Sequence, residues 1–498
     1  MAPPSPKKPA IITALTCLAA WTLVALVMIH RNLLFASGDD YSRVVLSMRW
    51  AREHYFFVEG YYWLPLPFWY YGLWNQGLGR IADFVHWFIP ASTLMMMLAS
   101  WALMLLTHEI NRPRESFSQK ARTGAVFAAL ILALTIPFAW RMTATALAEP
   151  VFMAGLSWLA LLLARFKRRP TRTKWILILA LCAALMWVRY EGWPIAFIAW
   201  MMACHASHAG PGPRPRFQWQ LIAGFAVLAI LPLTLMGIHA RYSMDPLYFL
   251  KFPRIFAMRM MPEVAGQTTW WRIQYLSSLA WGQGWVILPL FVFGLIDGRR
   301  RSELKMHALL VAFVWMSYYQ GAISNTFGSN PPGRFCVPSL WLSVPIAARG
   351  LMWAVRMRPR WLAWLARTLV AVAIFSQING ADLRNWGGIT HTPEMLRLAE
   401  HLARSARERN GYAVIADDES IGDNINLFRI YMGLDRVMCE SWWRPINLPI
   451  KGEFYYFTPR PLKGLEPAKS IAGQYMYVFD QWPIPGSKND MQHARRPK

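Results

Sequence analysis

The sequence is poor in acidic residues and in cysteine. Of its 498 residues, 27 are Asp or Glu, against 52 Lys or Arg, and five are Cys. So few cysteines, without paired spacings, argue against a disulfide framework and a zinc site. An internal repeat is also lacking, although such repeats are typical of membrane transporters. Disulfide-rich scaffolds are therefore disfavoured, and so, less strongly, are transporters.

Apolar and aromatic residues are abundant instead. Hydrophobic residues make up 55% of the chain, which has 27 Trp and a mean hydropathy of +0.24. Because a membrane span needs roughly 20 mainly apolar residues, long apolar runs predict a polytopic α-helical membrane protein with about 11 spans. The runs are 11–29, 84–106, 123–139, 146–164, 175–188, 193–204, 219–238, 279–296, 306–320, 336–355 and 361–378.

The excess of positive charge falls in alternate loops. A net charge of +25 would suggest nucleic acid for a soluble protein. Here the basic clusters precede residue 11 and recur at 112–122, 165–174, 214–216, 299–305 and 349–360. The positive-inside rule makes these loops cytoplasmic, so the N-terminus is expected to be cytoplasmic and the tail to lie outside. No nucleic-acid partner is expected.

Three parts are predicted along the chain. Residues 1–380 form a membrane body, within which 31–83 is a long first outer loop with interfacial helices. Residues 381–498 form a small α/β domain on the non-cytoplasmic side, with helices near 393–410 and 425–432 and strands near 412–416, 454–457 and 475–479. Charge parity predicts that 175–204 is two short helices meeting at an outer turn at 188–192, not one helix with charges at mid-membrane.

Two adjacent carboxylates, Asp39 and Asp40, open the amphipathic stretch of the outer loop. Helix capping and compensation of the helix dipole explain acids at such a place. The same geometry keeps a carboxylate ionised near neutral pH, so that it can act as a general base. Two acids could also hold a divalent cation, although the sequence supplies no third ligand beside them. These interpretations stay open at this point.

Other outer residues could complete a site. Trp63 opens a Pro-containing turn before an aromatic stretch, which an interfacial aromatic belt also explains. Glu149 heads the fourth span, where a first-turn acid is common. Arg189 and Arg334 lie in outer loops, against the charge trend, and Arg334 follows a rigid Pro-Pro-Gly turn, as suits a phosphate anchor. The acidic tail segment 417–423, with Asp417, Asp418, Glu419 and Asp423, could bind a metal or be a solvated loop.

Together these segments resemble the GT-C superfamily of membrane glycosyltransferases, in the branch similar to protein O-mannosyltransferases and the lipid A aminoarabinose transferase. The resemblance covers roughly residues 30 to 200 and 320 to 375 and rests on five short motifs in order. The motifs are Gly-Asp-Asp-Tyr-Ser-Arg at 38–43, the turn at 63–67, Ala-Glu-Pro at 148–150, Val-Arg-Tyr-Glu-Gly at 188–192 and Gly-Arg-Phe at 333–335. The His-Lys-Glu and Trp-Trp-Asp signatures of other branches are absent.

The resemblance implies roles for particular residues. Asp39, with Asp40 beside it, would be the base or position the acceptor; relatives often have Asp-Glu here, so either acid could act. Arg334 would contact the lipid phosphate, and Arg189 could contact it as well. The residues expected to bind substrate are Glu149, Glu191, Tyr41, Arg43 and Trp63.

An outward-facing site restricts the donor. Nucleotide sugars are not expected there, whereas a polyprenyl-phosphate sugar arrives through the membrane and leaves a phosphate that cations stabilise. We therefore expect an inverting transfer to a glycan, lipid or protein acceptor, with no required cofactor and a divalent cation as an option. The alternatives are a flippase for a lipid-linked sugar and a ligase or polymerase that uses a polyprenyl-diphosphate donor.

Overall fold

The computed structural model describes the chain in separate stretches. They are 7–31, 33, 38–57, 63–79, 86–111, 119–208, 217–242, 244–252, 255, 273, 275–299, 301–323, 333–356, 360–379, 393–409, 412–415, 424–439, 450–458, 466–471 and 474–482. These residues divide into two compact units. Unit 1 comprises Met1–Leu34, Tyr55–Pro67 and Ile89–Gly387, and unit 2 comprises Phe35–His54, Phe68–Phe88 and Gly388–Lys498.

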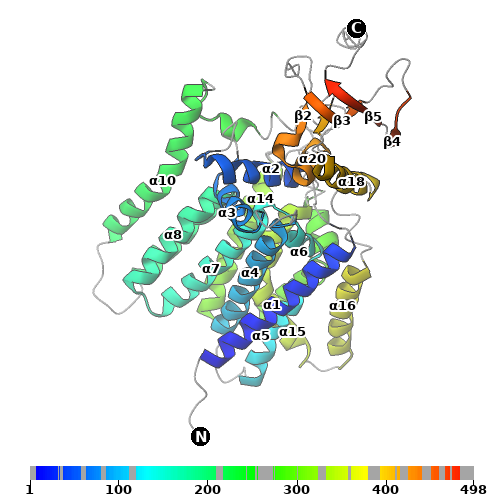
Figure 1. The fold of residues 1–498 in the computed structure, drawn as a ribbon. Coiled ribbons are helices and arrows are strands. Elements are labelled where there is room, and N and C mark those ends of the chain that lie inside the picture. Colours follow the sequence, from blue (N-terminus) through cyan, green and yellow to red (C-terminus); the bar gives the residue numbers. More distant parts are fainter. Residues whose placement is uncertain are drawn as a thin grey trace. The chain divides into compact units, whose positions relative to one another are not determined.

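Unit 1 is built from apolar helices. Its helices are α1 (Lys7–His30), α4 (Phe88–Ile110), α5 (Gln119–Ala133), α6 (Pro137–Arg141), α7 (Ala148–Arg168), α8 (Arg172–Val188), α9 (Gly192–His208), α10 (Phe217–Tyr242), α13 (Ile287–Gly298), α14 (Ser302–Ile323), α15 (Gly333–Ala354) and α16 (Arg360–Asn379). A 3-10 turn, η1 (Met142–Ala144), and a π-helical turn, η2 (Ser278–Gln283), join them. Figure 1 shows α7 and α8 side by side, and α9 packs against both.

These helices make the chain a polytopic α-helical membrane protein. Large apolar side chains remain exposed on their outer faces, for example Leu233 at 63%, Met316 at 64% and Phe375 at 65%, and such surfaces require lipid. Within the described residues, five helices are long and apolar enough to span by themselves, and six if the bent pair of α5 and α6 is one span. Every predicted run overlaps a helix, but α8 and α9 have 17 residues each and α13 has 12. The total of eleven spans stays a prediction.

The run at 123–139 is not the straight span that the sequence predicts. The chain bends by 78° between α5 and the segment that begins with α6. Pro137 is the first residue of α6, where a proline starts a helix readily but cannot continue one. The indole of Trp140 donates to the carbonyl oxygen of Leu134 at 2.9 Å and holds the break closed. The apolar composition therefore predicted the helix but not its interruption.

The backbones of helices α13 and α15 approach each other very closely, and a glycine lies at each close contact. A Cβ added to Gly350 would lie 1.8 Å from the carbonyl oxygen of Leu290, and one added to Gly294 would lie 2.0 Å from that of Ile346. Small residues allow membrane helices to approach in this way, where dispersion contacts drive association. These contacts fix the helix that carries Arg334.

Charged side chains gather at two opposite sets of helix ends. The starts of α7 and α15 and the turn between α8 and α9 carry one set. The ends of α4, α7 and α15 and the starts of α5 and α8 carry the other. The alternation of basic loops predicts this separation, and it assigns the second set to the cytoplasmic face.

Unit 2 combines α2 (Gly38–Glu53) and α3 (Leu66–Leu78) with the C-terminal segment. That segment has α18 (Pro393–Arg409), α20 (Asn424–Met432), the 3-10 turn η3 (Leu434–Arg436) and the strands β1 (Tyr412–Ile415), β2 (Val437–Cys439), β3 (Ile450–Thr458), β4 (Lys469–Ile471) and β5 (Gln474–Trp482). Within the predicted outer loop 31–83, helix α2 packs against α20 and η3 of the tail.

The five strands form one mixed sheet in the order β2-β1-β3-β5-β4. Strand β1 pairs in parallel with β2 and β3, with Ala413 opposite Val437 and Tyr455, and β5 runs antiparallel to β3 and β4. Helix α20 supplies the crossover that two parallel neighbours such as β1 and β2 require. The helices and strands predicted for the tail occur at the predicted places, close to their expected bounds.

Candidate functional site

Four charged residues that the sequence singled out separately come together in unit 1. Glu149 lies in the first turn of α7, and Arg334 in the first turn of α15. Arg189 and Glu191 lie in the turn between α8 and α9. We call these four residues the buried charge cluster. Three segments separated by tens to nearly two hundred residues thus contribute to one site.

Arg189 is the centre of the buried charge cluster. Its Nη1 donates to Glu149 Oε1 at 2.6 Å, its Nη2 to Glu191 Oε1 at 2.8 Å and its Nε to Glu191 Oε2 at 3.1 Å. The two contacts with Glu191 form a bidentate pair, the geometry in which arginine binds a carboxylate most strongly. Arg334 approaches the same oxygen, with Nε 3.7 Å from Glu149 Oε1. Glu149 therefore stands between two cations.

The cluster is largely removed from solvent but remains charged. The side chain of Glu149 is 2% exposed, and those of Arg334 and Arg189 are 10% and 11% exposed. Burial lowers the pKa of Arg189, but Glu149 and Glu191 raise it by more, so its pKa lies above the ordinary value. Buried charges persist when they are paired and hydrogen-bonded in this manner.

Local structure explains how the turn presents its charges. Helix α8 ends at Val188, and Arg189 has extended backbone with φ −150°. Gly192 then starts α9 and packs so tightly that an added Cβ would lie 2.4 Å from the carbonyl oxygen of Leu185. Residues two apart on a helix point in different directions, so Arg189 reaches Glu191 because the turn separates two helices. The predicted turn at 188–192 is confirmed.

An aromatic ring supports both cations. The Cζ atoms of Arg334 and Arg189 lie 4.8 Å and 5.5 Å from the ring centre of Phe335. Cations over an aromatic face are attracted to its electron density. The starts of α7, α9 and α15 contribute their helix dipoles here, each with its positive end toward this region. The arrangement suits an anion, because helix starts and guanidinium groups both favour negative charge.

Asp39 and Asp40 lie in unit 2. Both fall inside the first turn of α2, since the helix begins at Gly38, so neither is the residue that precedes the helix and caps it. The capping interpretation is thereby replaced by that of first-turn acids on the helix dipole. Asp40 is fully buried. The side chain of Asp39 lies outside the described residues.

The C-terminal segment holds the helix that carries these acids. Asn426 of α20 donates from Nδ2 to Ser42 Oγ of α2 at 3.2 Å. His86, which precedes α4, lies with Nε2 3.2 Å from the hydroxyl oxygen of Tyr431 of α20. Burial lowers the pKa of His86 from its ordinary value, so its ring is neutral at pH 7. Polar contacts therefore connect the first outer loop with the tail inside unit 2.

The remaining predicted residues have defined places. Tyr41 is buried on α2, and the Cζ atom of Arg43 lies 5.4 Å from the ring centre of Phe68 on α3. Trp63 is half-buried in unit 1. The tail acids at 417–423 lie outside the described residues. Within the residues that the structure does describe, no group of three or more His, Cys, Asp or Glu side chains could hold a metal ion.

Two buried residues of unit 1 were not singled out from the sequence. Tyr318 of α14 is fully buried and interacts electrostatically with Arg189 and Glu149. Arg141 at the end of α6 is fully buried as well. Tyr318 falls in an apolar run, so its position near the end of a predicted span was the available sequence signal for a role in the site. Arg141 falls in the segment that the bend re-directs, and that bend was not predicted.

Comparison with known proteins gives a result in structure but not in sequence. No family model matches the chain, and no curated protein matches it in sequence. Solved structures do match. One is the crystal structure of ArnT from Cupriavidus metallidurans bound to undecaprenyl phosphate, with a TM-score of 0.56 and 12% identity over 91% of this chain and 93% of that one.

The chain has a GT-C-like fold. The match with this ArnT structure extends over nearly the whole of both chains. The resemblance inferred from short motifs is thus confirmed at the level of the fold. At 12% identity the comparison speaks for the fold alone. In this fold the buried charge cluster includes the start of α7, at the opposite end of that helix from the basic residues Arg165 and Arg168.

Proposed function

We propose that the protein is a glycosyltransferase that moves a sugar from a polyprenyl-phosphate donor to an acceptor on the non-cytoplasmic face of the membrane. The observation that carries this proposal is the buried charge cluster, in which Arg334 and Arg189 meet at the starts of three helices. The fold adds support, since ArnT of similar fold was crystallised with undecaprenyl phosphate. The alternation of basic loops supports an outer position for the cluster.

Arg334 is the donor phosphate anchor in this proposal. Its Nε stands 3.7 Å from Glu149, farther than the 2.6 Å at which Arg189 contacts the same oxygen. Arg189 already directs three N–H groups at carboxylates. The guanidinium of Arg334 and the amide groups at the start of α15 both favour a phosphate at this place. Arg189 then acts as a positioning residue that holds Glu149 in place.

The transfer exchanges one bond at the anomeric carbon for another and moves one proton. An acceptor hydroxyl or amine attacks the anomeric carbon of the sugar from the face opposite the phosphate, and the bond between that carbon and the phosphate oxygen breaks. Asp39 or Asp40 takes the proton of the attacking group. The departing polyprenyl phosphate gains a negative charge, which Arg334 stabilises. Displacement from the opposite face inverts the configuration at the anomeric carbon.

The remaining predicted residues keep supporting roles in this scheme. Glu149 and Glu191 are proposed to act through Arg189, in addition to any contact with the sugar. Tyr41 and Arg43 share α2 with the two acids and are proposed to contact the acceptor or sugar, as is Trp63. No cofactor is required in this scheme. If a divalent cation acts near the acids, a chelator should lower the rate of transfer.

The test is transfer by the purified full-length protein in lipid nanodiscs or vesicles. A polyprenyl-phosphate sugar with radiolabelled sugar is supplied together with candidate acceptors, and the labelled product and free polyprenyl phosphate are both measured. We expect the two to appear in equal amounts. Movement of intact labelled lipid across vesicles without loss of sugar would identify a flippase instead. Reaction with the diphosphate donor alone would identify a ligase or polymerase.

A binding measurement tests the anchor separately. Undecaprenyl phosphate is titrated onto wild-type protein, Arg334→Ala and Arg241→Ala, the last being an exposed arginine at the end of α10. We expect Arg334→Ala to weaken binding about tenfold or more, since a hydrogen bond to a charged group is worth about 1.5–3 kcal/mol. Arg241→Ala should bind nearly as wild type does. Equal losses in both variants would contradict a specific anchor.

A further inference from the structure

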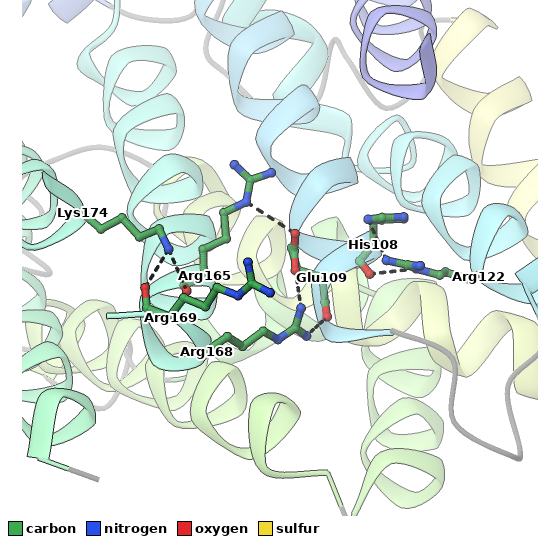
Figure 2. Close-up of polar contacts among 7 residues, drawn as sticks. All are labelled: His108, Glu109, Arg122, Arg165, Arg168, Arg169 and Lys174. Carbon is green, nitrogen blue, oxygen red and sulfur yellow. Dashed lines mark hydrogen bonds and ion pairs between the residues drawn. The ribbon is translucent and has the colours of Figure 1, made fainter. Parts of the chain in front are cut away.

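The opposite ends of the helices carry a second group of charged residues, which the proposed transfer does not use. Figure 2 shows it at the end of α4, the start of α5, the end of α7 and the start of α8. Arg122 donates from Nε to the carbonyl oxygen of His108 at 3.1 Å, and its Nη2 lies 2.9 Å from His108 Nδ1. The carboxylate of Glu109 pairs with Arg168 and, at 3.5 Å, with Arg165.

Part of this group has a structural role. Lys174 donates from Nζ to the carbonyl oxygens of Arg169 at 2.7 Å and Arg165 at 3.4 Å, at the end of α7. Thr171 accepts from the backbone of Lys174 and caps the start of α8. Cations at a helix end compensate its negative dipole. Capping therefore accounts for Lys174, and pairing with Glu109 accounts for Arg168.

The charges of this turn are far from balanced, however. Residues 165–174, which we call the basic turn, contain no acidic residue and six basic ones, namely Arg165, Lys167, Arg168, Arg169, Arg172 and Lys174. Arg169 and Arg172 are exposed. Glu109 supplies one negative charge from outside the turn (Figure 2). An excess of positive charge remains on this side.

Arg349, in contrast, is an arginine whose charge is balanced by a nearby acid. Arg349 of α15 is 1% exposed, and its Nη2 lies 2.5 Å from Asp297 Oδ2. Its Nη1 donates to Asn111 Oδ1 at 2.9 Å. At that position the chain provides an acid for its cation, whereas at the basic turn it provides a surplus of cations at the surface.

The excess positive charge affects the residues of the basic turn. Burial and then the positive charges of Arg165 and Arg169 lower the pKa of Lys174 from its ordinary value, and Glu109 raises it by less. An anion at this place would relieve the repulsion among these side chains.

Apolar side chains adjoin the basic turn. Ile176 and Leu177, one turn further along α8, are 49% and 46% exposed. They belong to α8, which the sequence predicts to enter the membrane, where lipid chains would cover them. Cations next to exposed apolar side chains match a phosphate headgroup next to its acyl chains, whereas a free phosphate would use the cations only.

We propose that the basic turn at 165–174 is a binding site for the phosphate headgroup of an anionic membrane lipid. Arg169 and Arg172 contact the phosphate, since arginine matches its oxygens in a bidentate manner. Ile176 and Leu177 contact the acyl chains. The site lies on the face that the basic loops assign to the cytoplasm, where anionic lipids attract basic segments at membrane surfaces. It is independent of the proposed transfer.

The test counts individual lipids bound to the full-length protein in neutral detergent by native mass spectrometry. Phosphatidylglycerol is the anionic probe, phosphatidylcholine the zwitterionic one, and inorganic phosphate the free anion. Wild-type protein should bind phosphatidylglycerol at least about tenfold more tightly than phosphatidylcholine, because one charge-assisted hydrogen bond gives about that factor. Inorganic phosphate at millimolar concentration should not displace the lipid. Displacement by phosphate, or equal binding of both lipids, would overturn the proposal.

A matched pair of variants locates the site. Arg169→Ala/Arg172→Ala removes two exposed charges from the basic turn, and Lys120→Ala/Arg360→Ala removes two exposed charges from the starts of α5 and α16 on the same predicted face. The first should lose the preference for phosphatidylglycerol by about tenfold or more, and the second should keep it. Equal losses would show a general surface charge effect and overturn the proposal. If the first variant does not fold, Arg172→Ala alone gives the same comparison with Arg360→Ala.

Discussion

Removal of Arg189 should destabilise the protein strongly. The change Arg189→Met keeps the length and apolar stem of the side chain but removes three hydrogen bonds, at 2.6, 2.8 and 3.1 Å, from two carboxylates. Glu149 is 2% exposed and Glu191 is 16% exposed, so water cannot solvate Glu149 in exchange. Loss of one partner from a buried ion pair costs about 3–5 kcal/mol. We expect a loss in that range.

The assay is equilibrium unfolding in mixed micelles of mild detergent and SDS, followed by circular dichroism. Lys251→Met is the matched control, because Lys251 Nζ contacts Asp245 at the same 2.6 Å but its side chain is 58% exposed. An exposed pair is screened by water and contributes little, so this variant should unfold close to wild type. The double variant Arg189→Met/Glu149→Gln should lose less than its two single changes together, because one buried carboxylate no longer lacks its partner.

Two outcomes would refute this reasoning. Equal destabilisation by Arg189→Met and Lys251→Met would mean that burial does not determine the cost of breaking these pairs. Strict additivity in the cycle of Arg189 and Glu149 would mean that the 2.6 Å contact contributes no coupling.

Two further predictions concern other parts of the chain. Gly350→Val should destabilise unit 1 because its Cβ would lie 1.8 Å from the carbonyl oxygen of Leu290, whereas Gly237→Val on α10, with open space around it, should be tolerated in the same unfolding assay. The pKa of His86 is lowered from 6.5 by burial beside Tyr431, so the unfolded chain binds its proton more readily and stability should fall as the pH drops below about 6.5. Melting temperatures between pH 5 and 8 should show a weaker fall for His86→Gln, and an identical pH dependence would contradict this assignment.

Much of the helical framework was predictable because lipid imposes a simple rule. Every buried backbone group must be satisfied inside its own helix, so apolar runs become helices, and loop charge predicted the turn at 188–192. The bend at 133–137 was missed because the residues around it are apolar on both sides. Pro137 was the available signal, since a proline inside a helical pattern marks a probable break.

The convergence of the site was not predictable from the sequence. Glu149, Arg189 and Arg334 were each singled out, Glu149 with an alternative explanation as a first-turn acid, but no contact among them was predicted. Their contacts depend on how α7, α9 and α15 pack, and that packing follows from distant small residues such as Gly350. Short motifs in order along the chain predicted the fold, and tertiary packing then determined which charges meet.

The most direct test of the proposed transfer concerns the two acids of α2. Labelled polyprenyl-phosphate sugar is supplied to purified wild-type protein, to Asp39→Asn and to Asp40→Asn, and the initial rate of sugar transfer is measured. General base catalysis contributes about 10²–10⁴-fold, so at least one of the variants should fall by a factor in that range while still binding undecaprenyl phosphate. Wild-type rates in both variants would contradict the assignment of the base.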